Sequence, residues 1–163
     1  MKAVATNTIE VGLAARTPAS ALPSTPVATS ASMPGSRLVD SAHGFPETIA
    51  RLDTAVGKRP LKVFAVIDHA GGAATLGTRI EPSRLLIIGN PALGTPFIEA
   101  NPAFAHELPL RILVYVEAGQ TRLAYPDIPA LSRAYGITAD QAPIDQVSAT
   151  LDAILSETTA PAG

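Results

Sequence analysis

Four side chains that could carry chemistry stand at the ends of apolar runs or inside one. Asp68 and His69 end one apolar run, Asn90 follows another, and Arg111 lies within a third. A carboxylate beside an imidazole can act as a general base or anchor a ligand. An arginine among apolar neighbours requires a carboxylate or a bound anion, and Asp68 is the partner we expect for Arg111. We therefore predict a site for a small polar or anionic ligand, lined by Asp68, His69, Asn90 and Arg111.

The same residues also have structural interpretations. Asp68 can cap the turn that follows its strand, which leaves His69 at the surface. A closed pair of Asp68 with Arg111 would stabilise the sheet without forming a pocket. Backbone amides near Gly94 and Thr95 could receive an anion if a helix begins there, although the spacing matches no phosphate-binding motif.

Three functions remain open from these residues. The first is a non-enzymatic homodimeric domain that binds a small ligand. The second is an enzyme in which Asp68 and His69 act as acid and base while Arg111 holds an oxyanion. The third is a structural module whose exposed strand edge pairs with another copy. An enzyme requires His69 at an open cavity, a binding domain requires only a cavity, and the structural module requires neither.

Composition excludes several classes of site. The chain has no cysteine, which rules out disulfides, thiolate metal sites and a cysteine nucleophile. The formal net charge of −2, without any basic cluster, argues against a nucleic-acid partner. The three histidines, His43, His69 and His106, do not have the spacing of a zinc motif. We expect neither a metal nor a cofactor.

The N-terminal part differs in composition from the rest. Residues 1–35 are rich in Ala, Pro, Ser and Thr, so we expect a disordered tail, followed by one folded domain over 36–157 and a frayed end over 158–163. No apolar run is long enough for a transmembrane helix. The start lacks the continuous apolar stretch of a signal peptide, which favours a cytoplasmic protein. Ala19-Ser20-Ala21 has the form of a cleavage site and leaves export by a degenerate signal as an alternative.

Strands and helices alternate in the predicted elements. Apolar patterns predict strands over 37–43, 61–68, 84–88, 108–117 and 120–125, the last two forming a hairpin at Ala118-Gly119. Helices are predicted over 45–57, over 95–105 with an interruption at Pro102, and in two parts between 129 and 154. The order β-α-β-β-α-β-β-α predicts an α+β domain, with helices packed on one side of a mostly antiparallel sheet of about five strands.

Several of these segments together resemble one family. They are His43–Thr48, Val63–His69, Leu86–Pro91 with Gly94-Thr95, and Leu108–Tyr115. In this order they are similar to the family called domain of unknown function 302, over roughly residues 37–137. The resemblance implies an α+β domain with a curved antiparallel sheet, similar to the TATA-binding-protein arrangement, that often forms homodimers. It implies no established activity. The long Ala/Pro tail departs from the family pattern.

Overall fold

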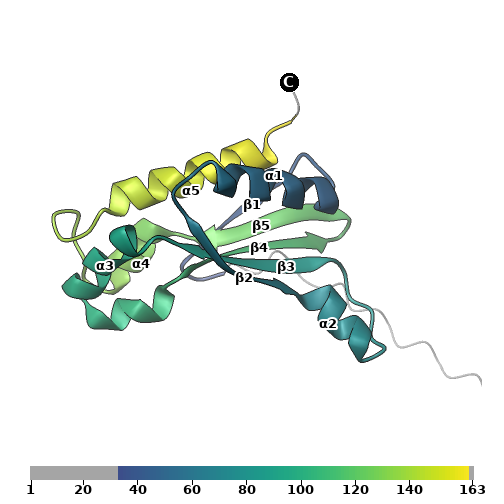
Figure 1. Ribbon diagram of the computed structural model, residues 1–163, viewed down its shortest axis with the longest axis horizontal. Helices are drawn as coiled ribbons and strands as arrows, with labels where there is room; N and C mark the ends of the chain where they lie inside the picture. Colours follow the sequence, from purple (N-terminus) through teal and green to yellow (C-terminus); the bar gives the residue numbers. More distant parts are fainter. Residues whose placement is uncertain (1–32, 162–163) are drawn as a thin grey trace, which may run out of the picture. The chain divides into compact units, whose positions relative to one another are not determined.

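Five antiparallel strands form the single sheet of the computed structural model, which describes residues 33–161 (Figure 1). Most of the predicted tail lies outside this range. The strands are β1 (Ser36–Asp40), β2 (Lys62–Asp68), β3 (Ser83–Gly89), β4 (Leu110–Glu117) and β5 (Gln120–Pro126). Their order across the sheet is β1-β5-β4-β3-β2, so β1 and β2 are the edge strands. The predicted α+β class is confirmed.

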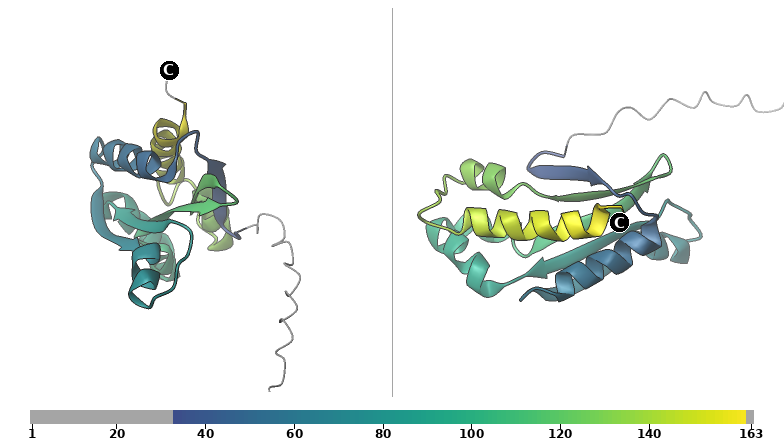
Figure 2. Two further views of the ribbon diagram at one scale, coloured as in Figure 1. Left: turned by 90° about the vertical axis from the view of Figure 1, so that its right-hand side faces the viewer. Right: turned by 90° about the horizontal axis from the view of Figure 1, so that it is seen from above.

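Two helices cover one face of this sheet, and the core lies between them and the strands. Helices α1 (Phe45–Gly57) and α5 (Ile144–Thr159) pack against each other over the same face (Figures 1 and 2). Their apolar positions recur at helical spacing and are buried, as the sequence predicted. The least exposed strand residues of the core, at 0 to 1% exposure, are Ile88, Ile112, Val114 and Leu123. We call the opposite side, which α1 and α5 do not cover, the open face.

The remaining helices lie at the two ends of the sheet. Helix α2 (His69–Thr75) continues directly from β2 at one end, while α3 (Pro91–Ala100) and α4 (Ile128–Ala134) lie at the other (Figure 1). The 3-10 helix η1 (Pro102–Glu107) follows α3. Helix α3 begins earlier than predicted, because the Asn90 side chain accepts a hydrogen bond from the Ala92 amide. The regular helix ends before Pro102, as expected.

The C-terminal helix extends beyond the boundary expected at residue 157. Helix α5 continues to Thr159, and the side chain of Thr158 is completely buried. Arg51 of α1 donates hydrogen bonds to the backbone carbonyls of Glu157, Thr158 and Ala160. These carbonyls lie at the C-terminal end of α5, where the backbone carbonyl groups have no hydrogen-bond donors within the helix. A side chain distant in sequence therefore stabilises the end of α5.

The hairpin between β4 and β5 agrees with its sequence prediction. Ala118 and Gly119 both have positive φ, at 51° and 80°. Two successive positive φ values are typical of the tight turn whose twist suits a two-residue hairpin. The turn therefore determines the pairing register of the two strands from local sequence alone.

Glu157 allows a test of the contact between α1 and α5. Its carboxylate accepts hydrogen bonds from Arg59 at 2.7 Å and from Lys58 at 3.1 Å. These bonds, the one from Arg59 first, lower the pKa of Glu157. Because the folded-state pKa lies below the unfolded value, the stabilisation is present above the unfolded pKa and is lost as pH falls through the folded pKa.

We predict that Glu157→Gln lowers the melting temperature at pH 7 by about 2 °C and lowers it less near pH 3. Thermal melts followed by circular dichroism at both pH values measure this difference. The matched control is Glu99→Gln, an exposed residue of α3, for which we expect no pH-dependent difference. An equal loss for Glu157→Gln at both pH values contradicts the role of the carboxylate charge.

Candidate functional site

The four predicted site residues lie at two different ends of the sheet. Asp68 is the last residue of β2 and pairs with Arg84, whereas Arg111 in β4 pairs with Ile87. Asn90 follows the opposite end of β3. With strands about 4.8 Å apart and a rise of about 3.3 Å per residue, the Cα atoms of Asp68 and Arg111 are roughly 14 Å apart. The structure thus brings Asn90 and Arg111 to one end, and Asp68 and His69 to the other.

Asp68 and Arg111 also point to opposite faces of the sheet. Asp68 is level with Arg84, which shares its face with the buried Leu86, while Arg111 is level with Ile87 on the open face. The predicted Asp68–Arg111 pair is therefore wrong. The Asp68 carboxylate instead accepts a hydrogen bond from the Gly71 amide at 2.9 Å and caps α2.

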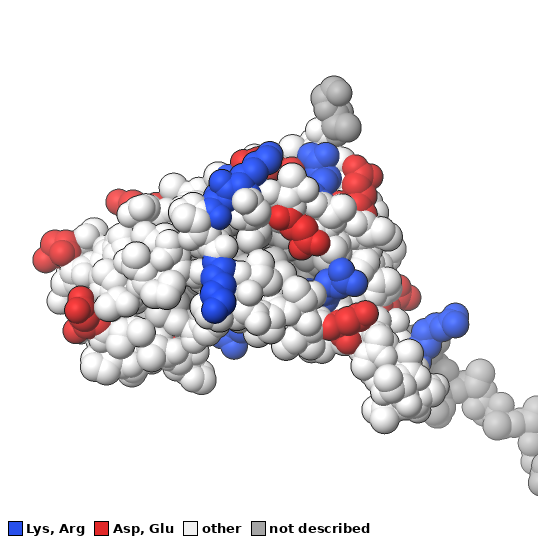
Figure 3. All heavy atoms as spheres, in the orientation of Figure 1, with Lys and Arg blue, Asp and Glu red and all other residues white. Residues whose placement is uncertain are grey.

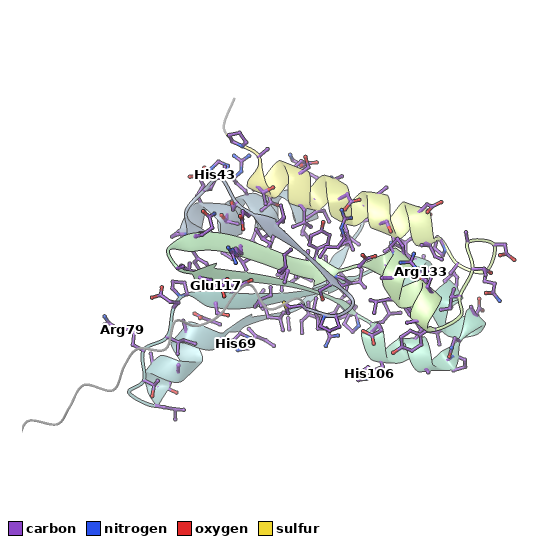
Figure 4. All side chains as sticks on the ribbon, turned by 180° about the vertical axis from the view of Figure 1, so that it is seen from behind. His43, His69, Arg79, His106, Glu117 and Arg133 are labelled. Carbon is purple, nitrogen blue, oxygen red and sulfur yellow. The ribbon has the colours of Figure 1, made fainter. Side chains whose placement is uncertain are left out.

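His69 is the first residue of α2 and is exposed. Figure 4 shows it toward the same end of the molecule as Arg79, away from His106. Within residues 33–161 its side chain makes no hydrogen bond or ion pair, and it lines neither of the two cavities described below. The structure places His69 at the surface, as in its structural interpretation.

The ion-pair partner of Arg111 is Glu107, the last residue of η1. The closest atoms, Nη2 of Arg111 and Oε2 of Glu107, are 3.5 Å apart, and the arginine side chain is 52% exposed. The other oxygen of Glu107 accepts a hydrogen bond of 2.8 Å from the Tyr135 hydroxyl. This bond and the carboxylate charge raise the pKa of Tyr135. The spacing of four residues from Glu107 to Arg111 was a sequence signal, but the intervening Pro109 excludes a continuous helix.

Asn90 has a structural role at the start of α3. Its oxygen accepts from the Ala92 amide at 2.9 Å, and its nitrogen donates to the Pro60 carbonyl at 2.9 Å. The Gly94 amide donates to the Asn90 carbonyl within the helix. Gly94, considered above as an anion site if a helix began there, is therefore not at a helix start, and its backbone amide already donates a hydrogen bond.

An apolar groove lies beside Asn90, on the open face. Its volume is about 260 Å³, and it runs between the start of β2, the end of β3, α3 and the segment after η1. Phe64 and Ile98 line it and are 47% and 37% exposed. On the core side of the same region is a smaller apolar cavity of about 40 Å³, lined by Phe97, Phe104 and other core residues. Sequence reasoning missed the groove because its walls come from four separate segments.

Two features of the described residues concern other kinds of site. Among residues 33–161, no three His, Asp or Glu side chains are grouped closely enough to hold a metal ion. No helix in the same range has the length and apolarity needed to cross a membrane.

Comparisons with known proteins agree with the resemblance seen in the sequence. A family model described as "Domain of unknown function DUF302" matches residues 38–158. The solved structure of an uncharacterized conserved DUF302 protein from Bacillus stearothermophilus superposes with a TM-score of 0.67 at 22% identity, over 76% of this chain and 98% of that one. That likeness supports the fold.

Two curated relatives carry a functional name. They are the fluoride-specific ion channels FluC 1 of Brucella suis biovar 1 and of Brucella abortus biovar 1, each 31% identical over 107 residues. The matched segment is 64% of this chain but only 42% and 40% of those proteins. The similarity thus spans less than half of the relatives' length.

The contact between Glu107 and Tyr135 allows a direct test. We predict that Glu107→Gln lowers the pKa of Tyr135 toward the ordinary value of 10.0, because the amide oxygen accepts a weaker hydrogen bond than the carboxylate and no longer repels the tyrosinate charge. Absorbance titration of tyrosinate, with Tyr135→Phe to identify the signal, measures the shift. Unchanged titration of Tyr135 in Glu107→Gln contradicts the effect of the Glu107 charge on the Tyr135 hydroxyl.

Proposed function

Because the chain belongs to the DUF302 family, whose members are domains of unknown function, we propose its role from its surfaces: it is a homodimeric binding module. The observation that carries the proposal is the exposed apolar surface of the edge strand β2. Four side chains of this strand, Val63, Phe64, Val66 and Ile67, are 40% to 52% exposed.

Apart from a β-bulge between Val63 and Ala65, strand β2 lacks the usual protection of an edge strand. Edge strands of monomeric proteins commonly carry charges or proline, which prevent another strand from pairing with them. In β2 the charged residues are only at the two ends, Lys62 and Asp68. The opposite edge strand β1 is different, because Arg37 forms an ion pair with Asp152, and Asp40 forms one with Arg122.

A second copy of the chain is the partner that suits this edge. Two β2 strands related by a twofold axis run antiparallel, so each can offer its free backbone groups and apolar side chains to the same surface on the other. The central residues of β2 carry no charge that the pairing must bury. The net charge of −2 for the whole chain also produces little repulsion between copies.

The Brucella relatives support a role as a module. In those proteins, named as ion channels, the similar segment is at most 42% of the chain, so most of each protein lies outside it. A domain found both in this chain and within longer proteins suits assembly or binding. The alternative of an Asp68–His69 enzyme has less support, since the Asp68 carboxylate caps α2 and His69 lines none of the described cavities.

A second role, binding of a small polar or anionic ligand, is favoured by the groove near Asn90. Of the four residues predicted for this role, Asn90 lines the groove and Arg111 belongs to the same end of the sheet. Asp68 and His69 would contribute only if another molecule brought a cavity to them. This role does not require the dimer, because the groove is formed within one chain.

We predict that Val66→Lys converts the dimer to a monomer, because its charge must be desolvated in the pairing of two β2 strands. Val66 is 52% exposed, so we expect the melting temperature of the folded chain to change by less than about 3 °C. Light scattering coupled to size-exclusion chromatography, over a range of protein concentrations, measures the oligomeric state.

The matched control is Leu38→Lys in β1, an apolar residue of the other edge strand that is 37% exposed. We expect this variant to remain dimeric. A parent chain that is monomeric at about 100 μM, or a dimer that is lost in Leu38→Lys but kept in Val66→Lys, contradicts assembly through β2.

A further inference from the structure

The groove on the open face has an apolar interior. Phe64 forms one wall, Ile98 of α3 another, and Gly89 with Pro109 the floor. Gly89 is closely covered, since a Cβ atom there would lie 3.3 Å from Cε2 of Phe64 and 3.5 Å from Cβ of Pro109. At about 260 Å³ the groove is slightly smaller than the roughly 300 Å³ at which pockets for drug-sized ligands begin, and suits a ligand of roughly ten heavy atoms.

Two residues that line the groove, Asn90 and Gly94, already use their hydrogen-bonding groups. Both ends of the Asn90 amide bond to backbone groups, and the Gly94 amide donates to a helix carbonyl. A ligand that depends on several polar contacts would find few partners here. The body of the ligand must therefore be apolar to gain from burial between Phe64 and Ile98.

Two cationic side chains flank this apolar space. Lys62 is level with Gly89 on the open face, and Arg111 is level with Ile87 two residues further along the same face. From the strand spacing and rise, their Cα atoms are roughly 12 Å apart, on either side of the groove floor. Both side chains are long and flexible enough to approach one another above it.

The charges of these two residues are only partly balanced. The Lys62 ammonium lies 5.1 Å from the centre of the Phe64 ring, and within residues 33–161 it forms no ion pair with a carboxylate. Arg111 has only the 3.5 Å contact with Glu107, whose other oxygen is bound to Tyr135. Figure 3 shows a largely uncharged surface between α3 and β2, with Lys and Arg atoms at its border. An anionic group at this border would complement both cations.

We propose that the groove binds a small amphiphilic carboxylate. Its apolar chain or ring lies between Phe64 and Ile98, and its carboxylate lies between Lys62 and Arg111. Arginine can hold a carboxylate through two parallel hydrogen bonds, and lysine adds a second charge. The proposal rests on the ligand-binding role suggested above for this end of the sheet, and it names the chemical class of the ligand.

Titration calorimetry of the full chain with sodium octanoate tests the proposal. Octanamide, which has the same chain but no charge, and acetate, which has the charge but no chain, are the matched probes. We expect octanoate to bind, octanamide to bind roughly tenfold more weakly, and acetate not to bind at millimolar concentration. Equal binding of octanoate and octanamide overturns the role of the cations, and no binding of octanoate overturns the proposal.

Variants locate the site. We expect Arg111→Gln and Lys62→Gln each to weaken octanoate binding roughly threefold, so that the two together account for the tenfold difference between the probes, and to leave octanamide binding unchanged. Arg79→Gln removes the same charge near α2, at the other end of the molecule (Figure 4), and should bind octanoate as the parent does. Ala105→Phe, at an exposed position that lines the groove, should abolish binding of both probes without lowering the melting temperature. Octanoate affinity that is equal in the parent, Arg111→Gln and Ala105→Phe overturns the assignment to this groove.

Two further measurements separate this proposal from the broader roles. The monomeric Val66→Lys variant should keep the parent's affinity for octanoate, because one chain forms the whole groove. Loss of octanoate binding in that variant overturns a groove complete in one chain. If octanoate fails but inorganic phosphate raises the melting temperature of the parent and not of Arg111→Gln, the small-ligand role stands and the carboxylate class is wrong.

Discussion

The antiparallel pairing of β3 with both β2 and β4 is the constraint on which the positions of all candidate residues depend. It sets Asp68 level with Arg84 and Arg111 level with Ile87, on opposite faces of the sheet. No side-chain rearrangement can bring the two groups together across a hydrogen-bonded sheet. The pairing therefore separates what looked in the sequence like one site. It also leaves Lys62 and Arg111 on a single face, beside the apolar groove.

Only part of the sheet is covered by helices. Helices α1 and α5 bury one face, and their contact is reinforced by Arg51 and Glu157 at the end of α5. The other helices lie at the ends of the sheet, so they shape the borders of the open face instead of covering it. At the edge strand β2 apolar residues remain exposed on both sides: Ile67 on the open face and Val66, level with Leu86, on the helix side. The two proposed roles, self-association and ligand binding, both arise from this incomplete coverage.

Glu107 connects the packing at one end of the sheet to the charge of Arg111. It is held by Tyr135, whose ring also packs edge-on against Phe104 at 5.1 Å between centroids. Phe104 in turn stacks on Phe97 of α3 at 4.9 Å. The carboxylate therefore stays in place beside an aromatic cluster, while its ion-pair partner Arg111 is half exposed. A carboxylate fixed by packing holds the neighbouring guanidinium near the proposed groove, which reduces the conformational entropy that ligand binding would cost.

Local sequence determined most elements of this protein, although not the short helix α2, and tertiary pairing decided which candidate site residues lie together. The apolar spacing of α1, the positive φ turn at Ala118-Gly119 and the break at Pro102 are local signals, and each predicted its element. The cap made by Asp68 was also recognisable, since its partner is only three residues away. The partner of Arg111, the groove at Phe64 and the exposure of β2 were not, because they depend on strand order and on which face each helix covers. Strand order and helix placement depend on contacts between residues that are distant along the chain. The periodicity of apolar residues within one segment contains no information about such contacts.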